Sequence, residues 1–205
     1  VLTFASAPDY ETKTSYTATV TATDGTNSTT QSITVNVTDV DDVAPAFSSS
    51  ATFSAAENQT AIGTVAATDV DTSDSSISFT VSGSELSITS AGVLTFASAP
   101  DYETKTSYTA TVTATDGTNS TTQSITVSVT NLNDNAPVFT SSATFTIYTG
   151  DTAIETVAAS DADGNAIAYS VSGTDSSSMA INSGTGALTL NSAADHTSKS
   201  SYAVT

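Results

Sequence analysis

A long internal repeat constrains the fold of this 205-residue chain more than any other feature of its sequence. The segment 1–37 returns as 93–129, a period of 92 residues, and the two copies differ only where Asn36 becomes Ser128. Because near-identical copies of this length favour the same local structure, we predict an array of one small type of domain.

The same period places the domain boundaries. Pro45 corresponds to Pro137, and the sequence SSATF, which begins at Ser49, begins again at Ser141. Boundaries just before the two prolines divide the chain into three parts. We expect the C-terminal part of a repeat A at 1–43, a complete repeat B at 44–135 and the N-terminal part of a repeat C at 136–205.

Repeat B consists of short runs in which apolar and hydroxyl-bearing residues alternate. In residues 108–115 one face carries only Thr and the other carries apolar side chains, which is the period of a strand with one buried face. The apolar positions are Tyr108, Ala110, Val112 and Ala114. Further runs lie at 62–68, 77–81, 86–88, 93–96 and 123–130. About seven such strands are typical of an immunoglobulin-like, Greek-key β-sandwich, so we predict an all-β protein of tandem sandwiches.

Charge restricts the partners of the chain. Its 21 acidic residues face only three lysines and no arginine, and the formal net charge is −18. Such a surface repels phosphate backbones and anionic lipids, so we expect no nucleic-acid partner, and it attracts cations. The sequence has no cysteine and no apolar run long enough to span a membrane. We therefore expect no membrane insertion, with any export signal outside these residues.

The most polar stretch is residues 130–139, TNLNDNAPVF. Its crowded amide and carboxylate groups would each cost about 2 to 7 kcal/mol if buried without partners, but they are the oxygen ligands that Ca2+ prefers. The stretch resembles the linker of tandem cadherin repeats, DxNDNxPxF. Further motifs resemble those of the same family: AENQT with Glu57, DVD with Asp69 and Asp71, DAD with Asp161 and Asp163, PDYE with Asp101 and Glu103, and TATDG with Asp116.

The resemblance implies calcium junctions between neighbouring repeats. For the junction of A and B the implied ligands are Asp9, Glu11, Asp39, Asp41, Asp42, Asp69, Asp71 and Asp116. For the junction of B and C they are Glu57, Asp101, Glu103, Asn131, Asn133, Asp134, Asn135, Asp161 and Asp163. A single acidic pair is usually a solvated surface feature, but five motifs in the order and spacing of the family, found twice, favour metal binding.

The sequence departs from the family pattern in several places. Asn131 replaces the leading aspartate of DxNDN, and Val43 replaces its last asparagine in the first linker. In repeat C, Thr149 stands 92 residues after Glu57, and only Asp195 remains of the PDYE acids. We expect calcium at both junctions and no full junction after repeat C.

These features predict a calcium-rigidified spacer in a long extracellular or cell-surface array that serves adhesion, with calcium ions and neighbouring repeats as partners. Near-identical repeats, few lysines, no cysteine and many acids make the chain resemble a bacterial cadherin-like surface adhesin. Because repeats A and C are incomplete in this sequence, head-to-tail self-association through exposed sheet edges is a further expectation.

Functions of other classes are less consistent with the sequence. A polysaccharide-binding module is the main alternative, although the aromatic residues occupy core-like positions. The Thr-x-Thr runs at 17–23 and 109–115 suit an ice-binding face poorly, because small sheets twist. His196 has no second histidine or cysteine beside it, and no nucleophile elbow or phosphate loop is present, so we expect no enzyme.

Overall fold

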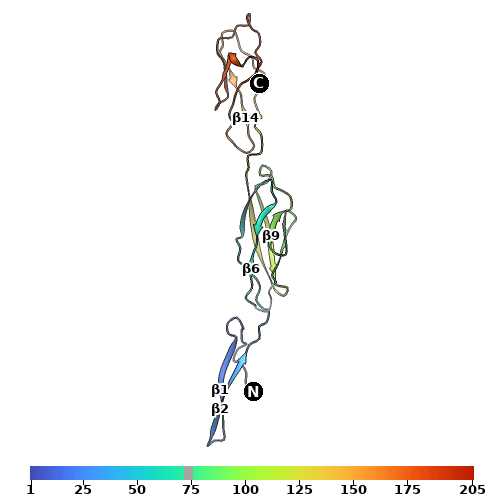
Figure 1. Cartoon of the computed structure of the whole chain (residues 1–205), viewed down its shortest axis with the longest axis vertical. Helices are drawn as coiled ribbons and strands as arrows, with labels where there is room; N and C mark the ends of the chain where they lie inside the picture. The colour runs from blue at the N-terminus through green and yellow to red at the C-terminus, as the bar shows by residue number, and fades with distance from the viewer. Residues whose placement is uncertain (72–75) are drawn as a thin grey trace. The chain divides into compact units, whose positions relative to one another are not determined.

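The computed structural model describes residues 1–71 and 76–205 and divides the chain into two compact units. Unit 1 is Val1–Thr130 and unit 2 is Asn131–Thr205. The regular secondary structure of both units consists of strands (Figure 1), apart from one 3-10 turn within the described residues, η1 (Ser176–Ser178). No helix in the described part of the chain has the length and apolarity of a membrane span. The all-β prediction is confirmed.

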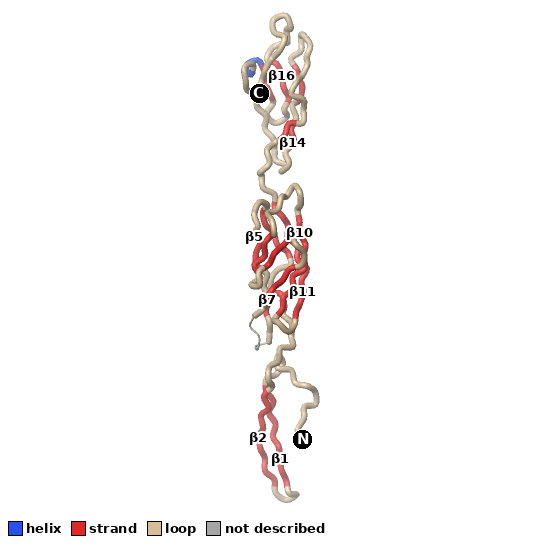
Figure 2. The backbone as a smooth tube through the Cα atoms, turned by 90° about the vertical axis from the view of Figure 1, so that its right-hand side faces the viewer, coloured by secondary structure: helices blue, strands red, loops and turns tan. Residues whose placement is uncertain are grey.

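Unit 1 contains a β-sandwich. One sheet has the order β4 (Thr52–Ala56), β11 (Ser120–Thr130), β10 (Ser107–Thr115) and β7 (Ser78–Val81). The other has the order β5 (Ala61–Thr64), β9 (Val93–Phe96) and β8 (Leu86–Ile88). Strands β4 and β11 are parallel, and the other pairs in these sheets are antiparallel. Figure 2 shows β5, β7, β10 and β11 together in this unit.

The strand boundaries agree closely with the alternating runs of repeat B. The runs at 86–88 and 93–96 are β8 and β9. The predicted strand at 62–68 is interrupted, because the chain changes its partner strand: the pairing with β9 ends with the hydrogen bond from the Val65 N–H to the Gly92 carbonyl at 2.8 Å, and β6 (Ala67–Thr68) then pairs with another strand. We did not predict β4 or the two-residue β3 (Ala46–Phe47), which pairs with β6.

The core of unit 1 lies between its two sheets. The inward positions of β10 and β11 alternate with threonine and serine, and they meet the apolar residues of β7, β8 and β9. Val112 and Ala114 are fully buried, as their alternation predicts, while Tyr108 and Ala110 are half-buried at the edge of the core. The buried set is Ala55, Val65, Phe79, Leu86, Leu94, Phe96, Val112, Ala114, Ile125, Val127 and Val129.

The hairpin of β1 (Ser15–Thr23) and β2 (Ser28–Asn36) repeats the sequence and the register of β10 and β11. The apolar side chains of the first hairpin are less buried than those of β10 and β11. Val20 is 47% exposed, whereas Val112, the same residue one repeat later, is 0% exposed. Alternation therefore determines strand and register, but burial depends on whether a second sheet covers the face.

Unit 2 contains fewer strands. β12 (Val138–Phe139) pairs with β14 (Ala159–Ser160). β13 (Ala153–Thr156), β16 (Ala187–Leu190) and β15 (Met179–Ile181) form a three-stranded sheet over a core of Met179, Leu188 and Leu190. Residues 144–148, which correspond to β4, are not a strand. The partner of β4 in unit 1 is β11, and residues 131–205 contain no counterpart of β11.

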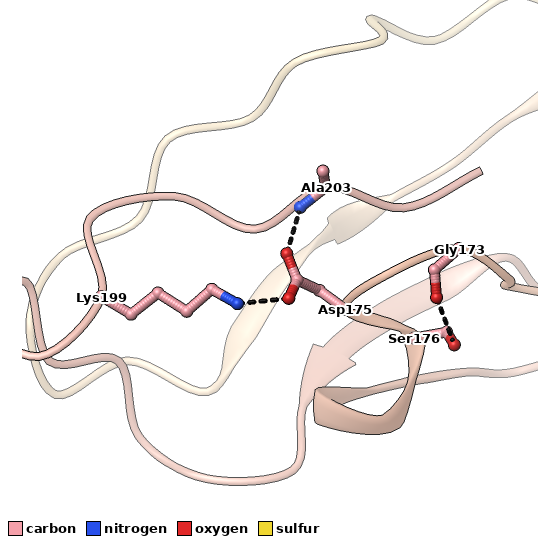
Figure 3. Close-up of polar contacts among 5 residues, drawn as sticks. All are labelled: Gly173, Asp175, Ser176, Lys199 and Ala203. Carbon is pink, nitrogen blue, oxygen red and sulfur yellow. Dashed lines mark hydrogen bonds and ion pairs between the residues drawn. The ribbon is translucent and has the colours of Figure 1, made fainter.

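Each of the three lysines lies over the ring of the tyrosine three residues later. The ammonium nitrogen of Lys13 is 4.4 Å from the centre of the Tyr16 ring, and Lys105 and Lys199 repeat the contact on their own tyrosines at 4.3 and 4.8 Å. Lys199 also forms an ion pair with Asp175 (Figure 3). The positive charges of the chain are thus all held locally by cation–π contacts.

Asp175 predicts an acid-sensitive contact in unit 2. Hydrogen bonds from Lys199 Nζ and from the Ala203 N–H, the latter at 2.7 Å, hold the pKa of the Asp175 carboxyl below its ordinary value (Figure 3). A lowered pKa contributes stability that is present above the ordinary pKa and is lost as the pH falls through the folded-state pKa. Asp175→Asn should therefore lower the melting temperature at pH 7, and the difference should shrink below about pH 4. Calorimetry checks this, with Glu155→Gln as an exposed control, and a difference that does not depend on pH would contradict it.

Candidate metal centre

The first candidate site is built where the linker of residues 39–43 meets the DVD motif. Only Ala44 and Pro45 separate the linker from β3, and Asp69 directly follows β6, so the pairing of β3 with β6 brings the two segments together. The Val43 N–H donates to Asp71 Oδ2 at 2.9 Å, and the Asp71 N–H donates to Asp69 Oδ1 at 3.0 Å. The motif is thereby fixed to the linker by backbone donors.

Three carboxylates converge at this place. Glu11, Asp39 and Asp71 each offer an oxygen, and these oxygens all lie within 4.8 Å of one another. A backbone hydrogen bond lowers the pKa of Glu11, but desolvation and the charges of Asp71 and Asp39 outweigh it and raise that pKa above its ordinary value. Like charges this close repel one another. The arrangement therefore favours a bound cation.

Buried carboxylate oxygens without donors strengthen this interpretation. Asp116 is 7% exposed; its Oδ1 accepts hydrogen bonds from the N–H groups of Thr118 and Asn119, at 2.7 and 2.6 Å. Its Oδ2 is buried and has no hydrogen-bond partner among the described residues, and the same is true of Asp69 Oδ2 and Asp71 Oδ1. A buried charged oxygen left without a partner is costly. Hard oxygen ligands of this kind fit Ca2+.

Other predicted ligands of the first junction lie at varying distances from this cluster. Asp41 accepts two hydrogen bonds from Asn119 Nδ2, at 3.0 Å to Oδ1 and 3.3 Å to its own carbonyl. Asp9 accepts from the N–H and the hydroxyl of Thr12, so its carboxylate stabilises a turn. Asp42 is exposed at the surface of the linker.

Unit 1 also carries part of the second predicted set. Glu57 is 2% exposed, and its Oε2 accepts a hydrogen bond from the Tyr102 N–H at 2.8 Å. One carboxylate oxygen of Glu57 lies within 4.8 Å of one from Glu103, which is exposed. Asp101 caps a turn through Thr104, as Asp9 does through Thr12. Glu57 and Glu103 thus form a pair of neighbouring acids, one buried and one open to solvent.

Unit 2 carries the rest of that set, gathered around Asp163. The N–H groups of Asp134 and Asn135 donate to Asp163 Oδ2 at 3.1 and 2.8 Å. Asn135 Nδ2 donates to Asp163 Oδ1 at 3.0 Å, and Asn131 Nδ2 donates to the Asp163 carbonyl at 3.0 Å. Asp161 accepts from the Asn165 N–H at 3.2 Å, and Asn133 is exposed.

Parts of this chain are similar to known proteins. Residues 51–130 match the family model described as "Cadherin domain". This part of the chain is similar to a cadherin domain. The chain is also 37% identical over 161 residues to "Protocadherin Fat 4" of Mus musculus, a match that covers 70% of this chain and 3% of that protein.

Solved cadherin structures share the fold. The structure titled "Protocadherin Gamma B2 extracellular cadherin domains 3-6" matches with 26% identity and a TM-score of 0.71, over 91% of this chain and 53% of that chain. The structure of mouse cadherin-23 EC22-24 matches with a TM-score of 0.69 over 94% of this chain and 68% of that one, and at 21% identity it shows the fold alone. The chain thus spans about half of the first solved protein and a small part of the protocadherin Fat 4 sequence.

The part of the chain that matches this family model contains one contact that the sequence did not predict. Asn119, in the turn between β10 and β11, connects the Asp116 turn to Asp41 of the linker. Its position three residues after Asp116 is a recognisable signal, because aspartate often accepts hydrogen bonds from N–H groups two and three residues later. The partner of its side chain, 78 residues away, has no such local signal.

Proposed function

We propose that the chain is a calcium-binding segment of an extracellular cadherin array. One observation carries the proposal: Asp69, Asp71 and Asp116 each place a buried carboxylate oxygen, without a hydrogen-bond partner in the described residues, in or beside the linker of unit 1. Bound Ca2+ would supply these oxygens with a counter-charge, and calcium accepts the six to eight oxygens of such a mixed set. The residues that would hold it in unit 1 are Asp9, Glu11, Asp39, Asp41, Asp42, Asp69, Asp71 and Asp116.

The second junction is proposed from the repeat period. Glu103, Asn131 and Asp163 stand 92 residues after Glu11, Asp39 and Asp71, which converge in unit 1. The segments that precede the two linkers, 1–37 and 93–129, differ at one position, which supports the same use of these positions. We propose the ligand set Glu57, Asp101, Glu103, Asn131, Asn133, Asp134, Asn135, Asp161 and Asp163, and the division into repeats A, B and C that it requires.

Calcium would act on this chain through charge. Without a counter-ion the carboxylates repel one another, which favours an open linker. A cation that binds only the ordered linker stabilises it by mass action, by about 2.7 kcal/mol at a hundredfold excess over the dissociation constant. Stiffened linkers would make the segment a spacer that holds an adhesive region away from a cell surface. Similarity of the whole protein to a bacterial adhesin is proposed from composition and repeat identity alone.

Calorimetric titration with Ca2+ and small-angle X-ray scattering, with calcium and with chelator, test this function. We expect binding at or below about 1 mM, the range of extracellular modules, and a narrower distribution of interatomic distances with calcium. Absence of binding at about 10 mM would refute the proposal. A glycan-array signal without a calcium response would instead support a polysaccharide-binding module.

A further inference from the structure

Two equivalent aspartates, one beside each linker, have different hydrogen-bond partners. Asp71 in unit 1 and Asp163 in unit 2 are equivalent residues, 92 positions apart. Both accept a backbone N–H at Oδ2, from Val43 at 2.9 Å and from Asn135 at 2.8 Å. One backbone hydrogen bond is therefore common to the two linkers, and in unit 2 the Asp134 N–H adds a second one to Asp163 Oδ2.

The side chains at this position differ. Asn135 Nδ2 donates a second hydrogen bond to Asp163, at 3.0 Å to Oδ1, and another to Asp134 Oδ1 at 2.8 Å. The side chain of Val43 has no hydrogen-bond donor. Asp71 Oδ1 is accordingly buried without a hydrogen-bond partner in residues 1–71 and 76–205. The Asn135 amide thus supplies Asp163 Oδ1 with a donor that Asp71 Oδ1 lacks among the described residues.

The two linkers also differ in negative charge. The first linker carries three carboxylates, Asp39, Asp41 and Asp42, whereas its counterpart carries one, because Asn131 and Asn133 replace two of them. Asn131 also supplies a donor to the Asp163 carbonyl. The first linker thus has more repulsion to overcome and fewer donors of its own.

From these differences we infer that the two linkers depend unequally on calcium. The linker at 39–43 is ordered by the cation, whereas the linker at 131–135 is held on Asp163 by its own amide groups and keeps its order when calcium is removed. This inference rests on the proposed calcium function and adds its regulation. As calcium falls, the first linker loosens before the second.

Hydrogen exchange of the whole chain, followed by mass spectrometry with Ca2+ and with chelator, tests the inference. The two linkers differ in sequence, TDVDDV against TNLNDN, so their peptides can be distinguished although the flanking strands are nearly identical. We expect chelation to speed exchange in the first linker by about tenfold or more, and in the second by much less. An equal acceleration in both linkers, or a larger one in the second, overturns the inference and leaves the calcium function standing.

Exchanging the two residues provides matched variants. Val43→Asn should reduce the effect of chelation on the first linker, and Asn135→Val should increase it on the second. Each variant tests the inference independently, so a failure of one to fold leaves the other informative. If both variants fold and neither changes the effect of chelation on its linker, the inference is wrong. If calcium alters exchange in neither linker of the unmodified chain and does not bind in calorimetry, the proposed function itself fails.

Discussion

Asp116→Asn should weaken calcium binding by unit 1 by about tenfold or more. Removal of a residue that merely supports a metal ligand typically costs about 10- to 100-fold in affinity, and a ligand carboxylate should cost at least as much. The asparagine keeps an oxygen that can accept the hydrogen bonds of Thr118 and Asn119, so the turn should survive the substitution. Calorimetric titration measures the change in dissociation constant.

The chain provides a matched control for this substitution. Asp24 occupies the same turn in the first hairpin and accepts the same two backbone hydrogen bonds, from Thr26 and Asn27. It is exposed and belongs to neither of the carboxylate clusters found in the described residues. Asp24→Asn should therefore leave calcium affinity unchanged. Equal losses from the two substitutions would contradict the assignment of Asp116 as a ligand.

Leu94→Ala should destabilise the sandwich of unit 1 by about 2 to 5 kcal/mol, because Leu94 is 0% exposed at the centre of its core and a cavity would remain. Its counterpart one repeat earlier, Leu2, is 66% exposed. Leu2→Ala should change stability by less than about 0.5 kcal/mol. Thermal unfolding followed by calorimetry compares the two variants.

The comparison of Leu94 with Leu2 separates burial from sequence, because the two residues have identical neighbours in the chain. A domain of about 100 residues loses about 4 to 8 °C of melting temperature per kcal/mol, so the Leu94 variant should show a shift that is easily measured. A similar shift in the Leu2 variant would mean that the first copy has a core of its own.

Local sequence accounts for the strands but not for which faces are buried. The alternation in residues 108–115 predicts β10 and its inward side chains, and the same letters in β1 predict a strand as well. Val20 nevertheless remains half exposed while Val112 is buried, because only one of them has a second sheet opposite. Such a difference depends on tertiary contacts that no window of ten residues contains.

The sequence likewise predicts only part of the candidate site. The acidic motifs identify Glu11, Asp39 and Asp71, which the structure brings together in unit 1. The motifs do not reveal that Asp9 stabilises a turn through Thr12, or that Asn119 reaches Asp41. These contacts join residues through backbone donors and turn geometry, which the spacing of acids does not specify. The ligand sets of both junctions, and calcium itself, stay predictions that the titrations test.

The lysine contacts have a consequence for the acidic linkers. All three ammonium groups of the chain are engaged by tyrosine rings, and two of them also by an acid outside the linkers. With no arginine in the sequence, the chain has no cationic side chain left over for its carboxylate clusters. A balancing charge would have to come from ions in solution, so we expect the order of the acidic linkers to depend on the ionic composition of the surrounding fluid.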